Sequence, residues 1–145
     1  MTQDERPADG QETTEQTIQA ILRESKTIAV VGLSPDPGRP SNGVARYMQA
    51  QGYRIVPVNP TQAEILGETC YASLSDIPFP VDVVDVFRRS EFVPPIAEEA
   101  VKIGAKALWL QLGVISSEGE ETAKRGGLRV VADRCLAIEH ERYGD

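Results

Sequence analysis

Five short apolar runs divide the sequence at nearly even intervals. The runs are TIAVVGL from Thr27, YRIVPVN from Tyr53, VDVVDVF from Val81, ALWLQL from Ala107 and LRVVAD from Leu128, and their starts are 26, 28, 26 and 21 residues apart. Short runs rich in valine, isoleucine and leucine are typical of parallel strands covered on both faces. Each interval is long enough for a crossover helix. The pattern predicts an α/β, Rossmann-like, doubly wound fold with a mainly parallel sheet of five or six strands and helices on both faces.

Apolar residues at helical spacing occupy most of the intervals. We expect helices at residues 14–24, in the stretch that ends before Gly52, at 95–103 and at 116–125. The stretch ILGETCY could supply a short extra strand, and residues 74–77 a helical turn. We place a single folded domain at residues 14–145 and interpret the polar, acidic residues 1–13 as a disordered tail.

Composition narrows the possible functions. The 145 residues carry a net charge of −7, which argues against a nucleic-acid partner because phosphate neutralisation dominates that affinity. No apolar segment approaches the roughly 20 residues that span a bilayer, so no membrane partner is expected. Two cysteines are too few for a disulfide scaffold and suit a reducing cytoplasm. The oligomeric state stays open.

The end of the first run has the features of a phosphate-binding loop. In open α/β sheets, ligands bind beyond the carboxyl ends of the strands, often at a helix N-terminus. The candidate residues here are Gly32, Leu33, Ser34, Arg39, Pro40, Ser41 and Asn42. Ser41 is expected to be the N-cap, and Arg39 adds a positive charge beside it. The alternative is a proline-stiffened turn without a ligand. The dinucleotide pattern G-x-G-x-x-G is not met, because Ser34 and Pro37 stand where it needs glycine.

The other strand ends supply the remaining candidate ligand-binding residues. These are Val58, Asn59 and Pro60, then Phe87 and Arg88, then Leu110, Gln111, Leu112 and Gly113, and finally Cys135. Of Arg88 and Arg89, we expect one to bind phosphate and one a surface carboxylate. Gln111 is expected to meet backbone or ligand. Cys135 beside Arg134 could form a reactive thiolate or be a small buried hydrophobic residue.

The sequence offers little that indicates a catalytic centre. His140 is the only histidine, so a histidine metal cluster or a Ser-His-Asp triad is not expected. We interpret His140 as a solvated or capping residue. Asp82 and Asp85 lie within a predicted strand and are expected to hydrogen-bond locally. The second strand lacks the terminal acid that accepts from the ribose in NAD enzymes, which counts against an NAD(P)-linked oxidoreductase, the alternative function.

Taken together, several stretches resemble the small stand-alone CoA-binding proteins, which are similar to the CoA-binding domain of the succinyl-CoA synthetase α subunit. The stretches are TIAVVGLSPDPGRPSNGVARYMQAQGYRIVPVNP, VDVVDVFRR, ALWLQLGV and VVADRCLAIEH. The resemblance implies that residues 32–34 and 39–42 hold the pyrophosphate, and that Asn59 and Pro60 border the adenine or ribose. It further implies that Phe87 and Arg88 flank the ligand and that residues 110–112 match the path of the pantetheine arm.

The cofactor implied by the resemblance is coenzyme A or an acyl-CoA. The protein would then be a carrier, sensor or thiol-protecting module with no catalytic activity of its own, and a ligand thiol near Cys135 could form a mixed disulfide. A CoA-binding subunit of a multi-chain synthetase, with an ATP-grasp partner, is a further alternative. The synthetases have a glycine-richer loop and a second domain with a phosphorylatable histidine, and neither feature matches this sequence.

Overall fold

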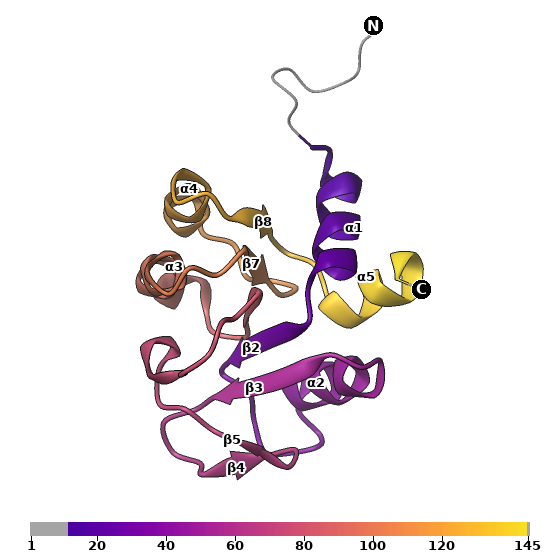
Figure 1. The fold of residues 1–145 in the computed structure, drawn as a ribbon, viewed down its shortest axis with the longest axis vertical. Helices are drawn as coiled ribbons and strands as arrows, with labels where there is room; N and C mark the ends of the chain where they lie inside the picture. The colour runs from indigo at the N-terminus through magenta and orange to yellow at the C-terminus, as the bar shows by residue number, and fades with distance from the viewer. Residues whose placement is uncertain (1–11, 145) are drawn as a thin grey trace, which may run out of the picture.

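One parallel sheet forms the centre of the domain. The computed structural model describes residues 12–144. The strands are β2 Thr27–Val31, β3 Arg54–Val58, β6 Val83–Val86, β7 Ala107–Leu110 and β8 Arg129–Val131. They pair in parallel in the order β3-β2-β6-β7-β8 (Figure 1). This five-stranded sheet confirms the predicted Rossmann-like fold class.

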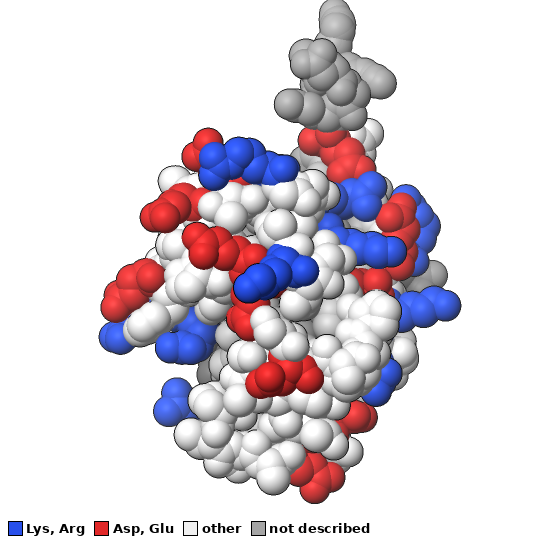
Figure 2. Space-filling view, turned by 60° about the vertical axis from the view of Figure 1, so that its left-hand side comes forward, with Lys and Arg blue, Asp and Glu red and all other residues white. Residues whose placement is uncertain are grey.

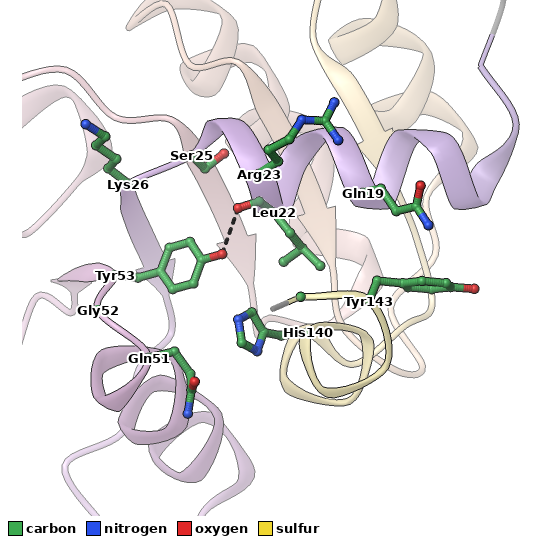
Figure 3. Close-up of a pocket in the computed structure, with 11 residues that line it drawn as sticks. Gln19, Leu22, Arg23, Ser25, Lys26, Gln51, Gly52, Tyr53, His140 and Tyr143 are labelled. Atoms are coloured by element: carbon green, nitrogen blue, oxygen red, sulfur yellow. Dashed lines mark hydrogen bonds between the residues drawn. The ribbon is translucent and has the colours of Figure 1, made fainter.

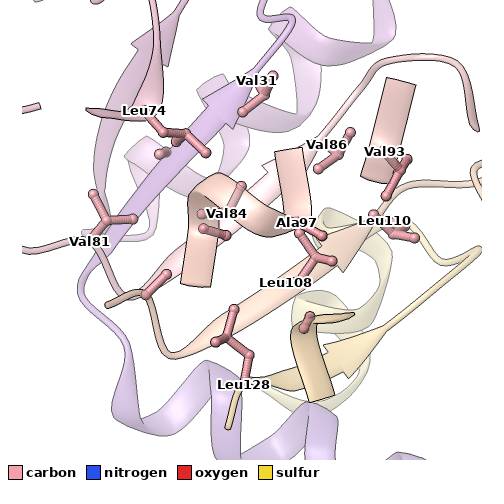
Figure 4. Close-up of a cluster of buried hydrophobic side chains, with 14 of the residues drawn as sticks. Val31, Leu74, Val81, Val84, Val86, Val93, Ala97, Leu108, Leu110 and Leu128 are labelled. Atoms are coloured by element: carbon pink, nitrogen blue, oxygen red, sulfur yellow. The ribbon is translucent and has the colours of Figure 1, made fainter. Parts of the chain in front are cut away.

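Helices cover both faces of the sheet. One face carries α1 Thr14–Glu24, α2 Pro40–Ala50 and α5 Leu136–Tyr143, and the other carries α3 Val93–Lys102 and α4 Ser117–Arg125 (Figure 1). Successive residues of a strand point to opposite faces, so each strand contributes to two separate cores. Val84 and Val86 of β6 pack with α3 and α4 (Figure 4), whereas Val83 packs in the core beneath α1, α2 and α5. Burial on both faces explains why the strands are apolar throughout.

The helix starts follow from the local sequence. At α1, the Thr13 hydroxyl accepts from the Gln16 amide while the Gln16 side chain accepts from the Thr13 amide, which is a capping box. At α4, Ser116 accepts from the Gly119 amide. Helix α3 begins at Val93, two residues earlier than predicted, directly after the 3-10 turn η3 Ser90–Phe92. The prolines that follow Val93 are tolerated because amides in a first helical turn have no helical partner.

Helix α5 differs from the sequence prediction, whereas the short extra strand and the helical turn expected after β3 are both present. Helix α5 was not predicted, because its eight residues, LAIEHERY, are short and mostly polar. The irregular interval after β3 holds an antiparallel hairpin, β4 Glu64–Ile65 with β5 Glu68–Thr69, followed by the 3-10 turn η2 Leu74–Asp76. The hairpin forms a separate two-stranded sheet and does not extend the main one.

The first eleven residues of the predicted tail lie outside the described part of the chain. The tail's last two residues are described: Thr13 caps α1, and the Glu12 carboxylate lies 2.9 Å from the Arg129 guanidinium of β8. This ion pair lowers the pKa of Glu12 through its hydrogen bond to Arg129. Among residues 12–144, no helix is long and apolar enough to cross a bilayer.

Charged side chains of both signs are interspersed on the face that includes α3 and α4 (Figure 2). Acidic and basic groups lie beside one another there, with uncharged surface between them. This face therefore has no extended field of one sign that would attract a polyanion. A binding site for an anionic ligand has to be sought at the ends of the strands.

Candidate functional site

The order in which successive strands are added to the sheet reverses between β2 and β6. From β2 the chain continues to β3 on one side, and it later returns to add β6, β7 and β8 on the other side. Ligands of open α/β sheets bind outside the carboxyl ends of the strands at such a switch point. The residues that follow β2 and β6 at this edge are Gly32 and the Phe87-Arg88 pair.

Gly32 makes the sharp turn that leads out of β2. Its φ is +89°, and its amide donates to the Val58 carbonyl at 3.1 Å. A Cβ atom at this position would lie 3.1 Å from both the Phe87 carbonyl oxygen and the Arg88 Cδ. Both the backbone conformation and the close neighbours therefore require glycine here.

A Gly32→Ala substitution is expected to destabilise the fold by about 1–3 kcal/mol, because alanine at positive φ is strained and its Cβ also meets backbone. Gly127→Ala is the matched control, since Gly127 has a φ of +90° but no atom within 4 Å of the added Cβ. Urea unfolding of both variants measures the difference. Equal losses of unfolding free energy would show that the contacts with Phe87 and Arg88 do not matter.

The loop after Gly32 is held in shape by buried polar side chains. The Ser41 hydroxyl accepts from the Ser34 amide at 3.0 Å, and the Asn42 side chain donates to the Ser34 carbonyl at 2.8 Å. Ser41 and Asn42 are only 5% and 2% exposed. The Ser34 hydroxyl in turn accepts from the Asp36 amide. These side chains position the loop backbone rather than facing solvent.

Ser41 is not the N-cap that the sequence predicted. The helix begins at Pro40, so Arg39 is the N-cap, and the Arg39 side chain makes no capping hydrogen bond. Proline is favoured at the first helical position because its φ suits the helix and its missing N–H costs nothing there. Ser41 is consequently the second residue of the helix, which is past the capping position, and its side chain bonds to the loop instead.

Asn59 ties the end of β3 to the same loop. Its side-chain nitrogen donates to the Leu33 carbonyl at 2.9 Å, and its oxygen accepts from the amide and hydroxyl of Thr61 at 2.8 and 2.9 Å. Asn59 therefore fixes the loop relative to β3.

Several hydrogen-bond donors remain available around the loop. The amides of Leu33 and Ser41 donate to no other residue among those described. Arg39 and Arg88 are exposed and pair with no carboxylate within residues 12–144. The Arg88 guanidinium lies 4.4 Å from the centre of the Phe92 ring, which holds it beside the loop. Free amides and unpaired guanidinium groups are the donors that bind phosphate oxygens.

Leu33, Arg39 and Arg88 line a cavity of about 540 Å³, whereas Ser41 does not reach it. This volume suits a nucleotide-sized ligand. The sequence-predicted residues that line it are Gly32, Leu33, Ser34, Arg39, Val58, Asn59, Pro60 and Arg88. Glu99 also lines it, but its carboxylate accepts from the amide and hydroxyl of Ser75 at 3.0 and 2.8 Å. The Glu99 carboxylate is therefore already hydrogen-bonded to Ser75.

Sequence reasoning missed some residues of this cavity. Ala72, Ser73 and Leu74 come from the segment before and within η2, and Ile96 and Glu99 come from α3. None of them follows a strand directly, so the rule of strand ends could not find them. Arg46 was also missed: it holds Asn42 and the Pro37 carbonyl in place. Its spacing of four residues from Asn42 on a helix was the available signal.

The remaining predicted residues lie elsewhere or point elsewhere. Leu110 is fully buried in the core beneath α3 and α4, and Phe87 packs against the opposite core. The Gln111 side chain accepts from the Leu136 amide at 3.1 Å, so it meets backbone, one of the two predicted partners. Of the two arginines after β6, Arg89 lies 3.8 Å from the Glu91 carboxylate.

Leu112 and Cys135 line a second, smaller cleft at the ends of β7 and β8. This cleft has a volume of about 370 Å³. Leu112 is 62% exposed, and the half-buried Cys135 is the N-cap of α5. The Gly113 amide donates to the Asp133 carboxylate at 2.7 Å, which joins the ends of the two strands. The predicted residues that line a cavity are thus divided between two of them, and the others line neither: Pro40, Ser41, Asn42, Phe87, Leu110, Gln111 and Gly113.

Asp82 directly precedes β6 and Asp85 lies within it, and the two side chains have different hydrogen bonding. Asp82 accepts from the amides of Lys26 and Thr27 at 2.8 and 3.0 Å and so connects β6 to the start of β2. Asp85 is fully buried, and neither of its carboxyl oxygens has a hydrogen-bond partner. The expectation of local hydrogen bonds is therefore wrong for Asp85. Burial raises the pKa of Asp85 well above its usual value.

His140 is not the solvated residue that the sequence predicted. It is only 9% exposed, and its Nδ1 lies 2.9 Å from the Tyr47 hydroxyl. The error arose because α5, which carries His140 against α2, was not predicted. No group of three or more histidine, cysteine or acidic side chains that could hold a metal ion is found among residues 12–144.

A doubly wound sheet with free amides and arginines at its switch point is the arrangement of a Rossmann-like nucleotide-binding domain. The family model of a CoA binding domain matches residues 26–141, and the chain therefore belongs to this family. The family assignment confirms the resemblance found in the sequence. It also relates the chain to the CoA-binding part of acyl-CoA synthetases.

Sequence relatives include short proteins and much longer ligases. The chain is 46% identical to the protein YneT of Bacillus subtilis over 123 residues, which are 85% of this chain and 91% of YneT. It is 32% identical over 131 residues to the ADP-forming acetate–CoA ligase II of Archaeoglobus fulgidus. That match covers 82% of this chain and 20% of the ligase, so the chain spans about a fifth of the ligase's length.

Solved structures show the same two groups. A hypothetical protein from Pyrococcus horikoshii is 41% identical and superposes with a TM-score of 0.86 over 98% of this chain and 99% of its own. The dinucleotide-forming acetyl-coenzyme A synthetase 1 of Candidatus Korarchaeum cryptofilum is 28% identical, with a TM-score of 0.69. In that case the match covers 80% of this chain and 28% of the synthetase.

Proposed function

We propose that the protein binds coenzyme A or an acyl-CoA at the carboxyl edge of the sheet and has no catalytic activity of its own. The cavity at the β2–β6 switch point would hold the nucleotide part, with the diphosphate at the loop that follows Gly32. The protein would then act as a carrier, sensor or thiol-protecting module. The exposed Arg39 and Arg88, which line this cavity beside the loop and pair with no carboxylate among the described residues, carry this proposal.

Side chains of the protein hold the loop in place. Ser41, Asn42 and Asn59 form hydrogen bonds to its backbone. A loop held in this way loses little freedom on binding a ligand, and the exposed Arg39 and Arg88 can bond directly to phosphate oxygens. The two arginines add full positive charges in a chain whose net charge is −7.

The same geometry favours CoA over NAD. A NAD-binding domain offers a carboxylate at the end of its second strand for the ribose hydroxyls. Here that position is Asn59, whose side chain is occupied by Leu33 and Thr61. The family match to a CoA binding domain supports the same choice.

Calorimetric titration of the purified protein with CoA and with NADH tests this proposal. We expect CoA to bind at one site per chain with an affinity that falls as salt is added, because charge neutralisation contributes to it. NADH is expected to give no saturable heat at the same concentrations. Saturable NADH binding without CoA binding would overturn the proposal in favour of an oxidoreductase.

A second candidate function is the CoA-binding subunit of a multi-chain synthetase. The observation that favours it is the match to one segment of larger ligases, of which the chain spans about a fifth in one case. Such a role requires an ATP-grasp partner. Co-purification of the natively expressed protein with an ATP-grasp chain would support this function over a stand-alone role.

The mixed disulfide between Cys135 and the ligand thiol stays a prediction. Cys135 and Leu112 lie in the cleft at the ends of β7 and β8, three strands along the edge from β2. Strands are about 4.8 Å apart, so the separation is about 14 Å. An extended pantetheine arm is of similar length to about four extended residues. Mass spectrometry of protein purified without reductant would show the adduct on Cys135.

A further inference from the structure

Another cavity, similar in volume to the one at the β2–β6 switch point, lies at the opposite edge of the sheet. Its volume is about 520 Å³. It is bordered by the end of α1, the turn from α2 into β3 and the last turn of α5 (Figure 3). β2 and β3 begin here, whereas the loop after Gly32 lies where they end. The cavity is therefore separate from the proposed CoA site and has no part in it.

Aromatic side chains held by hydrogen bonds form the inner wall of this cavity. The Tyr53 hydroxyl donates to the Leu22 carbonyl at 2.8 Å, and the His140 Nδ1 lies 2.9 Å from the Tyr47 hydroxyl. The Tyr53 and His140 rings meet edge to face with centroids 5.7 Å apart. Figure 3 shows Leu22, Tyr53 and His140 converging, with Tyr143 to one side. Three rings and a leucine, from helices α1 and α5 and the turn into β3, form the largely apolar inner surface of the cavity.

His140 leaves one polar atom of this wall unused. The ring is more than nine-tenths buried and lines the cavity. Its Nε2 forms no hydrogen bond with any residue between 12 and 144. This nitrogen is not one of the fully buried polar atoms that lack a partner, so it is open to the cavity and can bond to a ligand there.

Among the described residues, the charged groups at the rim of the cavity are both cations. Arg23 and Lys26 line it, together with Gln19, Ser25 and Gln51, and no acidic residue between 12 and 144 lines it. Arg23 stands in the last turn of α1, where it also offsets the partial negative charge of the helix end, and it lies 3.6 Å from Glu24. Lys26 lies beyond the helix, and its ammonium group pairs with no carboxylate in the described part of the chain.

From these features we infer that the cavity is a second ligand site, for a small molecule with a planar ring and an anionic group. The ring would lie against Tyr53 and His140, with His140 Nε2 as its hydrogen-bond partner. The carboxylate or phosphate would lie toward Lys26 and Arg23. The occupancy of this site does not depend on the proposed CoA function.

The only histidine of the sequence makes this site readable by NMR, because a single imidazole resonance reports on it. The probes are adenosine 5′-monophosphate, adenosine and inorganic phosphate, each added to protein already saturated with CoA. We expect adenosine monophosphate to shift the His140 resonance in a saturable manner. Adenosine, which lacks the anion, and phosphate, which lacks the ring, are each expected to bind at least about tenfold more weakly.

A lysine pair provides the matched control. Lys26→Gln is expected to weaken the binding of adenosine monophosphate about fivefold, whereas Lys106→Gln, an exposed lysine that precedes β7 and lines no cavity described above, should leave it unchanged. A His140 resonance unmoved up to about 10 mM probe, a weak limit for a specific site, would overturn the inference. So would equal responses to phosphate and to adenosine monophosphate, or an affinity indifferent to Lys26→Gln. If the protein does not bind CoA, the same titration on the unliganded protein still decides the question.

Discussion

Replacing both Arg39 and Arg88 with glutamine is expected to weaken CoA binding about 100-fold. Each guanidinium group borders the cavity at the switch point and pairs with no carboxylate among the described residues, so both are available to phosphate. A hydrogen bond to a charged group contributes about 1.5–3 kcal/mol, and the loss of two such contacts, partly screened by solvent, gives about 2.7 kcal/mol. Calorimetry measures the change directly.

Two other basic residues supply the control for this pair. Lys124 and Arg125 lie exposed in the last turn of α4 and line neither of the strand-end cavities. Replacing both with glutamine removes the same charge from the chain. We expect CoA affinity to stay within about twofold, because exposed charges at a distance are screened by salt. Equal losses in the two double variants would mean that net charge alone, and not the loop, governs binding.

Asp85→Asn is expected to stabilise the protein progressively as the pH rises above about 4. Asp85 is fully buried without hydrogen-bond partners, and burial raises its pKa well above the usual value. A carboxyl whose pKa is higher in the folded state favours folding below its unfolded pKa. That contribution is lost as the pH rises towards the folded pKa. Asparagine has the same shape and does not ionise, so the variant escapes this loss.

The measurement is urea unfolding of both proteins over a series of pH values that starts just above the unfolded pKa of about 4 and rises from there. In that window the variant's advantage should grow by about 1.4 kcal/mol per pH unit until the folded pKa is reached. Asp76→Asn, a change of the same chemistry at an exposed site, shows what the loss of a carboxylate does without burial. A difference between Asp85→Asn and the parent that is constant with pH would contradict the argument.

The sheet could be predicted because its strands carry their own signal. Continuous apolar runs at even spacing identify parallel strands buried on both faces, and all five were found. Helix α5 has no such signal, because LAIEHERY is short and its buried positions include Glu139 and His140. Its absence from the prediction led directly to the misplacement of His140, which only α5 brings against Tyr47.

The sequence could predict which residues lie at the edge of the sheet but not what each of them does there. The rule of strand ends selects Gly32 and the residues after it, several of which line the cavity at the switch point, because that rule depends only on topology. It cannot tell a residue that would contact a ligand from one that holds the loop. Ser41 and Asn59 bond to Ser34 and Leu33, which are 7 and 26 residues away in the sequence. Residues of η2 and α3 enter the cavity through packing, which no local pattern records.

Asp85 shows a different limit. Within VDVVDVF, both aspartates interrupt an apolar run, and sequence alone gives them the same environment. In the structure, Asp82 precedes β6 and accepts hydrogen bonds from two amides at the start of β2. Asp85 instead lies between Val30 and Trp109 in the middle of the sheet. A difference of three positions in the sequence therefore separates a hydrogen-bonded carboxylate from one without a hydrogen-bond partner.

The central claim is that the loop after Gly32, with Arg39 and Arg88 beside it, holds the diphosphate of CoA. The most direct test is to follow the backbone amide resonances of the isotope-labelled protein while CoA is added. We predict the largest shifts at Leu33 and Arg39, with smaller ones at the ends of β7 and β8. Saturable CoA binding that leaves Leu33 and Arg39 unmoved, and shifts residues around Cys135 or His140 instead, would contradict the claim.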